Sequence, residues 1–308
     1  MDISLLLFEQ TLNGIQFGVF LFLIAAGLTL VFGIMNLVNL AHGALYMMGA
    51  YVGATIFAST GSFTLAIILS VPAMMLFGVL VEVIALRTLY ERDHMDQVLA
   101  TFGLILFFNE LVRIVWGPES QPMPIPEALS GHIEIITGAP YPVFRIVIIG
   151  VGLAVAAGLF LLISKTRIGM LIRAGASNRP MAGALGVNIQ MLYTLVFGLG
   201  AVLAGLSGVM AGPLLAVEPG MGEDMLILSF VVIVIGGIGS IRGALVASVI
   251  IGIVETVGRS ILPIALEAVL SNEAAQTAGP AVASMLIYVL MAAVLFFRPE
   301  GLFPARTG

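Results

Sequence analysis

The chain alternates between long apolar runs and short polar interruptions over its whole length. The apolar segments lie at 15–35, 44–58, 63–86, 97–115, 143–163, 190–212, 225–238, 244–258 and 281–297. An α-helix needs roughly 20 residues to cross the hydrocarbon core of a bilayer, and the segments at 44–58 and 225–238 are shorter than that. The pattern therefore predicts eight or nine membrane segments, some of them short, tilted or broken.

Composition places the chain among integral membrane proteins. Of its 308 residues, 60% are hydrophobic and only 9% are charged, whereas ordinary soluble domains carry roughly 25% charged residues. Glycine and alanine recur within the apolar runs, which is typical of helices whose backbones pack closely in lipid. We expect an all-α integral membrane protein, a polytopic helical bundle in which residues 1–308 form a single transmembrane domain in contact with membrane lipid.

The sequence carries no motif for covalent or metal chemistry. It has no cysteine, and His42, His94 and His132 belong to different parts of the predicted topology, so a common metal site is not expected. Neither a Ser/His/Asp arrangement nor a phosphate-binding glycine loop is present. We therefore expect a transport protein that is not an enzyme, binds no cofactor of its own and has no nucleic acid partner.

Basic residues predict the orientation, because cytoplasmic loops of membrane proteins are enriched in Lys and Arg. Three interruptions hold most of them, and these share the cytoplasmic side if nine segments cross and the N-terminus lies outside. The N-terminus carries Asp2 and Glu9 without a basic residue, which also argues against a cleaved signal peptide. The Pro-rich stretch at 117–142 then falls outside. The basic residues concerned are Arg87 and Arg92, then Lys165, Arg167, Arg173 and Arg179, and finally Arg298 and Arg306.

The longest basic interruption runs from Lys165 to Ile189 and reads KTRIGMLIRAGASNRPMAGALGVNI. It holds four of the twelve basic residues and no acidic residue. A connection that only reverses the chain needs a few residues, so a basic stretch of this length that can form helix indicates a docking surface. Its charge predicts that this surface faces the cytoplasm.

A polar stretch at the start of the second apolar segment is a candidate for a pathway or gate. Asn36, Asn39 and His42 are spaced by three residues and are followed by Gly43, so on a helix they would form a slowly drifting polar stripe. Polar side chains and irregular backbone at membrane depth persist only against protein or a water-filled cavity. The alternative interpretation is a plain cytoplasmic turn with solvated polar residues.

A glycine-rich stretch lies where the seventh apolar segment ends and the eighth begins. Gly236, Gly237, Gly239 and Gly243 fall within eight residues, with Ser240 among them. Each glycine lowers helix stability by up to ~1 kcal/mol relative to alanine, so a continuous helix is not expected here. A broken helix would expose a helix N-terminus near Gly243 to a substrate carboxylate. The alternative is that the glycines only allow close helix packing.

Single charges within the apolar segments have local partners in the sequence. Glu110 and Arg113 are spaced for an ion pair on one helix face, and so are Glu255 and Arg259. Glu82 lies close enough in sequence to reach the basic interruption that begins at residue 87. If Glu82 or Glu255 were instead unpaired, it could relay protons. A proton-coupled secondary transporter and a passive channel therefore stay open as alternatives at this point.

Five motifs along nearly the whole chain resemble one family of transporters. They are GLTLVFGIMNLVNLAHGALYMMGAY at 27–51, IRAGASNRPMAGALGVNI at 172–189, FGLGAVLAGLSGVMAGPL at 197–214, IGGIGSIRGALVASVIIGIVE at 235–255 and LFFRPEGLF at 295–303. Their types and their order resemble the LivH-type permease of branched-chain amino acid ABC importers.

The resemblance implies a permease subunit in a bacterial inner membrane. The basic residues predict that its N-terminus is periplasmic and its C-terminus cytoplasmic. It implies pairing with a second permease of the LivM type, two cytoplasmic ATPases similar to LivG and LivF, and a periplasmic substrate-binding protein. ATP and Mg²⁺ are then expected on the ATPases. Whether the two permeases of such a complex differ or are identical stays open.

The resemblance also assigns roles to residues of the loop at 165–189, which would be the coupling element that sits against an ATPase. The family pattern is carried by Arg173, Ala174, Asn178, Ala182, Leu185, Gly186 and Asn188. One departure is that 174–176 reads Ala-Gly-Ala and lacks the glutamate of the Glu-Ala-Ala loop found in many importers. The pathway or gate is expected at Asn36, Asn39, His42, Gly43, Gly236, Gly237, Gly239 and Ser240.

The substrate class implied by the resemblance is branched-chain or other hydrophobic amino acids. Related systems import urea, short amides or aromatic acids by the same mechanism. This chain carries Ala44 where many amino acid importers of the family carry aspartate, so the substrate itself stays open.

Overall fold

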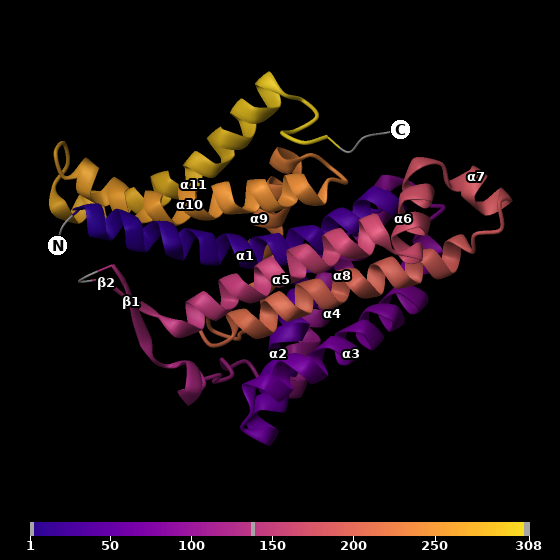
Figure 1. The fold of residues 1–308 in the computed structure, drawn as a ribbon, viewed down its shortest axis with the longest axis horizontal. Helices are drawn as coiled ribbons and strands as arrows, with labels where there is room; N and C mark the ends of the chain where they lie inside the picture. Colours follow the sequence, from indigo (N-terminus) through magenta and orange to yellow (C-terminus); the bar gives the residue numbers. More distant parts are fainter. Residues whose placement is uncertain (1–2, 137–138, 305–308) are drawn as a thin grey trace.

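The computed structural model describes residues 3–136 and 139–304, so Asp2 and Arg306 lie outside the described residues. Over these ranges the chain is a helical bundle with one short β-hairpin (Figure 1). The helices are α1 (Ile3–Met35), α2 (His42–Thr60), α3 (Phe63–Val81), α4 (His94–Trp116), α5 (Val143–Lys165), α6 (Arg167–Ser177), α7 (Arg179–Ala184), α8 (Ile189–Ala211), α9 (Met221–Gly236), α10 (Ile241–Leu266) and α11 (Asn272–Phe297).

Every predicted apolar segment falls on one of these helices. In the described ranges, seven helical stretches are long and apolar enough to span a membrane: α1, α3 with its extension to Leu89, α4, α5, α8, α10 and α11. The two segments predicted to be short correspond to α2 and α9, which are not among the seven. The prediction of a polytopic helical bundle with short or broken segments is thus confirmed.

Contacts between the central helices give their relative directions. The Ser207 hydroxyl on α8 donates a hydrogen bond of 3.1 Å to the Phe20 carbonyl on α1, and Gly200 packs on Gly27, so the two helices are antiparallel. By the same reasoning α10 is antiparallel to α1, because Gly252 packs on Gly14 whereas Ser248 lies beside Gly18. Figure 1 shows α1, α5, α8 and α10 extended along the long axis of the molecule.

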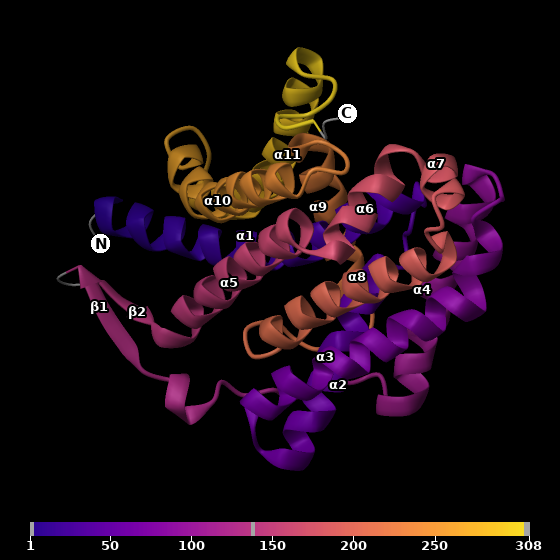
Figure 2. The same ribbon diagram turned by 45° about the vertical axis from the view of Figure 1, so that its right-hand side comes forward.

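The connections consequently sort onto two ends of the bundle. One end holds the α3–α4 connection, the loop at 165–189, the α9–α10 junction and residues 298–304, and we call it the basic end. Figure 2 shows α6 and α7 at this end, opposite the N-terminus and the hairpin. It carries Arg87, Arg92, Lys165, Arg167, Arg173, Arg179, Arg242 and Arg298, whereas Arg113, Arg145 and Arg259 lie toward the other end.

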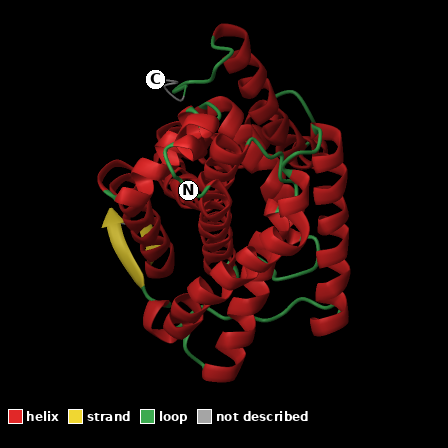
Figure 3. Cartoon of the chain, turned by 90° about the vertical axis from the view of Figure 1, so that its right-hand side faces the viewer, coloured by secondary structure: helices red, strands yellow, loops and turns green. Residues whose placement is uncertain are grey.

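The opposite end holds the strand structure of the described residues, at the margin of the bundle (Figure 3). Within the Pro-rich stretch, β1 (His132–Ile136) pairs antiparallel with β2 (Ala139–Pro142). The same stretch is tied to the α8–α9 connection, since the backbone N–H of Gln121 donates to the Val217 carbonyl at 2.8 Å. The sequence patterns did not predict this hairpin, because proline and glycine dominate its surroundings.

Helix α2 begins inside the bundle and not at its surface. The ring of His42, the first residue of α2, contacts the carbonyl of Ile24, which lies on α1 about 16 Å before its last residue at a rise of ~1.5 Å per residue. Gly43 at this start contacts Gly222 in the first turn of α9. The irregular residues 36–41 therefore return into the bundle, and this explains why the second apolar segment is too short for a full crossing.

The segment after α11 folds back onto the end of α9. The backbone N–H of Leu302 donates to the Ile235 carbonyl at 2.8 Å, and that of Phe303 donates to the Gly236 carbonyl at 3.0 Å. The last carbonyls of a helix lack partners within the helix. Residues 298–304 thus complete the end of α9 with main-chain hydrogen bonds.

Close backbone contact at glycine sets how the central helices cross. An ideal Cβ placed on Gly49 of α2 would lie 2.2 Å from the Cα of Gly205 on α8. An added methyl group has no space there unless a helix moves. In contrast, a Cβ on Gly158 of α5 meets no atom within 4 Å.

We expect Gly49→Ala to destabilise the purified protein by about 1–3 kcal/mol, the usual cost of overpacking a well-packed core. Gly158→Ala is the matched control and should leave the protein as stable as the parent or slightly more stable, because alanine favours helix. Thermal unfolding in detergent measures both. Equal melting temperatures for the two variants would contradict the close α2–α8 contact.

Candidate functional site

The loop at 165–189 forms a helical hairpin whose three helix starts are each capped by a side chain. Thr166 accepts from the N–H of Gly169 at the start of α6, and Asn178 accepts from the N–H of Met181 at the start of α7. Asn188 accepts from the N–H of Met191 at the start of α8. Such caps satisfy N–H groups that have no partner within the helix, so the local sequence specifies this hairpin.

The predicted coupling residues divide into capping, turning and outward-facing positions. Asn178 and Asn188 are the caps just described, and Ala182 faces inward. Arg173 is exposed and its guanidinium donates to the Ile163 carbonyl at the end of α5. Ala174, Leu185 and Gly186 are exposed.

The hairpin presents apolar side chains beside its basic ones. Met170, Met181 and Leu185 are 55%, 57% and 78% exposed. The hairpin has no acidic residue, and its arginines lie on the same two helices as these methionines. A surface of this kind is suited to a protein partner, because apolar anchors with arginine are enriched at the centre of interfaces.

Gly186 lies just after α7 and has a left-handed backbone conformation, with φ 89°. Residues with a side chain are strained in this region, whereas glycine adopts it freely. Space does not explain the glycine, since a Cβ there would meet no atom within 4 Å. The backbone conformation alone requires it.

The predicted pathway residue His42 lies in a slot between α1 and α8. Its Nε2 is 3.1 Å from the Ile24 carbonyl, and the ring is fully buried. A Cβ on Gly27 would lie 2.9 Å from this nitrogen, and one on Gly200 would lie 3.5 Å from Cε1 of the ring. The slot therefore exists because both helices have glycine at this level.

The neighbouring asparagines show that this stretch is neither a helical stripe nor a surface turn. Asn36 leaves α1 in the left-handed conformation, at φ 53°, and is exposed. Asn39 is fully buried, and neither atom of its side-chain amide has a hydrogen-bond partner among the described residues. Buried polar groups are normally paired, so Asn39 is an exception at the point where α2 enters the bundle.

The glycine-rich stretch interrupts the helical structure between α9 and α10, as predicted. Gly237 and Gly239 have φ of 103° and 82°, and Gly236 packs directly on Gly243. The hydroxyl of Ser240 accepts from the Gly243 N–H at 3.1 Å. The Ser240 hydroxyl therefore already occupies the Gly243 N–H. This N–H belongs to the helix start that we predicted could bind a substrate carboxylate.

Glycine contacts show where the two predicted pathway stretches lie relative to α1 and α9. A Cβ on Gly33 would lie 3.1 Å from the Cα of Gly239, so the exit of α1 touches the α9–α10 junction. At the other end of α9, Gly43 touches Gly222. Asn36 to Gly43 and Gly236 to Ser240 therefore border the two ends of α9.

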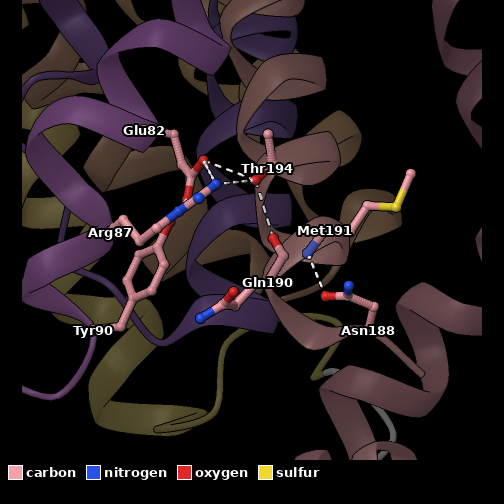
Figure 4. Close-up of polar contacts among 7 residues, drawn as sticks. All are labelled: Glu82, Arg87, Tyr90, Asn188, Gln190, Met191 and Thr194. Carbon is pink, nitrogen blue, oxygen red and sulfur yellow. Dashed lines mark hydrogen bonds and ion pairs between the residues drawn. The ribbon is translucent and has the colours of Figure 1, made fainter. Parts of the chain in front are cut away.

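A buried carboxylate organises the junction of α3 and α8 at the basic end (Figure 4). Glu82 is fully buried and pairs with Arg87, whose Nη2 lies 3.0 Å from Oε2. The Tyr90 hydroxyl donates to Oε1 at 2.6 Å, and the Thr194 hydroxyl on α8 lies 2.8 Å from Oε2. The Thr194 hydroxyl also lies 3.0 Å from the Gln190 carbonyl of its own helix.

The ion pairs predicted from the sequence are present, but the further members of the Glu82 cluster were missed. Glu82 pairs with Arg87, Glu255 with Arg259 and Glu110 with Arg113. Thr194 had no signal in the sequence, because it is 112 residues from Glu82. Burial of the phenol, and then its hydrogen bond to Glu82, raise the pKa of Tyr90, so it stays a donor at physiological pH.

A groove of about 440 Å³ runs beside this cluster, between α3 and the first turns of α8. Its walls combine apolar side chains with the amide of Gln190 and the guanidinium of Arg87. The residues of α3 and α8 that line it include Met75, Val79, Met191 and Leu195.

Comparison with known proteins shows one family over most of the chain. The family model described as "Branched-chain amino acid transport system / permease component" matches residues 10–295. The high-affinity branched-chain amino acid transport system permease protein BraD of Pseudomonas aeruginosa is 31% identical over 314 residues, which cover 96% of this chain and 94% of BraD.

Two further relatives are similar over shorter stretches. LivH of Escherichia coli K12, which bears the same description, is 30% identical over 267 residues, covering 82% of this chain and 86% of LivH. A probable LivH of Methanocaldococcus jannaschii is 28% identical over 251 residues, covering 77% of this chain and 76% of its own length. No solved structure matches the chain.

The His42 slot generates a stability prediction that is independent of transport. His42→Phe should cost about 1–3 kcal/mol, because the ring loses its contact with the Ile24 carbonyl and overfills a space bounded by Gly27 and Gly200. His94→Phe, at an exposed position, is the matched control. Thermal unfolding of both purified variants tests this, and a His42→Phe protein as stable as the control would refute the slot.

Proposed function

The chain belongs to the family of branched-chain amino acid transport permeases, and from this premise we propose that it is the membrane subunit through which an ABC importer moves branched-chain or other hydrophobic amino acids. The relatives BraD and LivH are named as permeases of high-affinity branched-chain amino acid transport systems. The observation that carries the proposal is the family match together with the exposed, basic and partly apolar hairpin of α6 and α7.

In the proposed complex, the chain pairs with a second permease of the LivM type in a bacterial inner membrane. Two ATPases similar to LivG and LivF bind ATP and Mg²⁺ on the cytoplasmic side, and a periplasmic binding protein delivers the substrate. The basic end faces the cytoplasm, since eight of the basic residues gather there. The N-terminus is then periplasmic, and residues 298–304 lie on the cytoplasmic side.

The hairpin at 165–189 is proposed as the coupling element. Its outward side chains, Arg173, Ala174 and Leu185, would contact an ATPase, whereas Asn178, Ala182 and Asn188 hold its shape. ATP-driven movement of the hairpin would reach the bundle through α8. This helix packs on α1, α2 and α3.

The pathway is proposed to pass the buried start of α2 and the break after α9. Asn39 and His42 supply polar groups at depth, with Gly43 and the neighbouring Asn36 at the bend of the chain. Gly236, Gly237, Gly239 and Ser240 allow the α9–α10 junction to bend. Alternating arrangements of these two stretches would open one side at a time.

The ion pairs argue against a proton-coupled transporter. Both acids that such a mechanism could use, Glu82 and Glu255, are paired with an arginine. In each pair the guanidinium donates a hydrogen bond to the carboxylate, so neither acid is free of a basic partner as a proton relay would need. Uptake by the isolated chain under a pH gradient would favour that alternative, and counterflow without any energy source would indicate a passive channel.

Substrate choice is tested on the complex. Purification with native partners should bring down two ATPases, a second permease and, when crosslinked, a periplasmic binding protein. That binding protein should bind leucine, isoleucine or valine in calorimetry. Binding of urea, short amides or aromatic acids in place of these would keep the transport mechanism and change the substrate.

The coupling proposal predicts a separation of ATP hydrolysis from transport. In the complete complex in proteoliposomes, Gly186→Val strains the hairpin turn, and Arg173→Gln removes an outward charge. Each should lower the stimulation of ATPase activity by the loaded binding protein by about 5-fold or more. The permease itself should remain folded.

The chain offers a matched control for the glycine. Gly61 also has positive φ, 66°, and open space around it, but it lies at the opposite end of the bundle. Gly61→Val should keep the stimulation of the parent complex. Normal stimulation in Gly186→Val and Arg173→Gln would remove the coupling role from this hairpin.

A further inference from the structure

A continuous series of contacts leads from the hairpin at 165–189 to the buried carboxylate of α3. The Arg179 guanidinium on α7 lies over the ring of Tyr193 on α8, 5.9 Å from its centroid. Tyr193 in turn packs edge to face on Tyr90, with ring centroids 5.1 Å apart and an interplanar angle of 84°. The Tyr90 hydroxyl then donates to Glu82.

The end of α3 has the irregular geometry of a hinge where this series arrives. Beyond Val81 the helix continues as a π-turn at Glu82–Leu86 and a 3₁₀ turn at Arg87–Leu89. A 3₁₀ turn is common at the end of a helix, whereas a π-turn is rare and occurs frequently at functional sites, because the hydrogen-bond register changes there. Glu82 fastens the hinge to itself through Arg87 and Tyr90, and to α8 through Thr194.

The chemistry of Glu82 makes intermediate arrangements unfavourable. Its side chain is fully buried, and a buried charge that loses one of its partners carries a large desolvation penalty. The cluster is therefore either closed with all its donors or rearranged as a unit. An element with two discrete arrangements is what energetic coupling between distant sites requires.

We propose that Arg179, Tyr193, Tyr90 and Glu82 form a relay that carries movement of the α6–α7 hairpin to the hinge at the end of α3. The four are positioning residues, and the proposal rests on the coupling role proposed above for the hairpin. Arg179 is the input, the two tyrosines transmit through their rings, and Glu82 is the output. The relay gives the ATPase a route to α3 that bypasses the length of α8.

The test uses the complete complex in proteoliposomes, with a binding protein loaded with leucine. The measured quantity is the ratio of stimulated to basal ATPase rate, which does not depend on the amount of folded complex. Tyr193→Leu removes the ring, and Tyr193→Phe keeps it. Tyr90→Phe removes only the hydroxyl that donates to Glu82, so it tests the relay even if Glu82→Gln folds poorly. Glu110→Gln, in an exposed ion pair at the other end of α4, is the control.

We expect Tyr193→Leu, Tyr90→Phe and Glu82→Gln to lower the ratio by about 2- to 30-fold, with basal rate and co-purification of the ATPases unchanged. Tyr193→Phe and Glu110→Gln should match the parent complex. Arg179→Gln and Glu82→Gln combined should lower the ratio no further than the stronger single variant, because residues in series are not additive.

Three results overturn the relay. The first is that every single variant of the relay has the same ratio as the parent complex while Gly186→Val lowers it. The hairpin would then still be the coupling element, but the relay would not act. The second is multiplication of the Arg179→Gln and Glu82→Gln effects, which shows independent action. The third is an equal fall of basal and stimulated rates, which shows a merely structural role. If Gly186→Val is also parental, the proposed coupling function itself fails.

Discussion

Close backbone contact around α8 is the interaction on which the rest of the structure depends. Gly200 faces α1, Gly205 faces Gly49 on α2, and Gly208 faces the carbonyl of Tyr46. In lipid the hydrophobic effect does not drive helices together, so packing at small residues has to do so. Because α8 has no side chain at these three positions, α2 can start deep in the bundle with the His42 ring beside α8.

The same central helix joins the two regions that we propose act in transport. At the basic end, Asn188 caps α8 and the hairpin of α6 and α7 immediately precedes it. Further along, Gly200 borders the slot of His42. The same helix thus contacts the end of α3 through Thr194 and borders the buried start of α2 through Gly200.

Much of this structure could be predicted from patterns of residues close together in the sequence. Contacts between residues far apart in the sequence could not be predicted in this way. Apolar run lengths gave the helices, and the glycines at 236–239 gave the break between α9 and α10. The spacing of Glu255 and Arg259 gave their ion pair. Run length could not reveal that residues 36–41 re-enter the bundle, since that depends on Gly27 and Gly200 facing each other. Thr194 beside Glu82 likewise depends on how α3 crosses α8.

The return of residues 298–304 to α9 has a consequence for how the protein matures. The carbonyls of Ile235 and Gly236 receive their partners from Leu302 and Phe303, which the ribosome adds only after α10 and α11 have been made. Until then the last carbonyls of α9 in a nascent chain lack these main-chain partners. The α9–α10 junction therefore acquires its final hydrogen bonds only after α11 has been made.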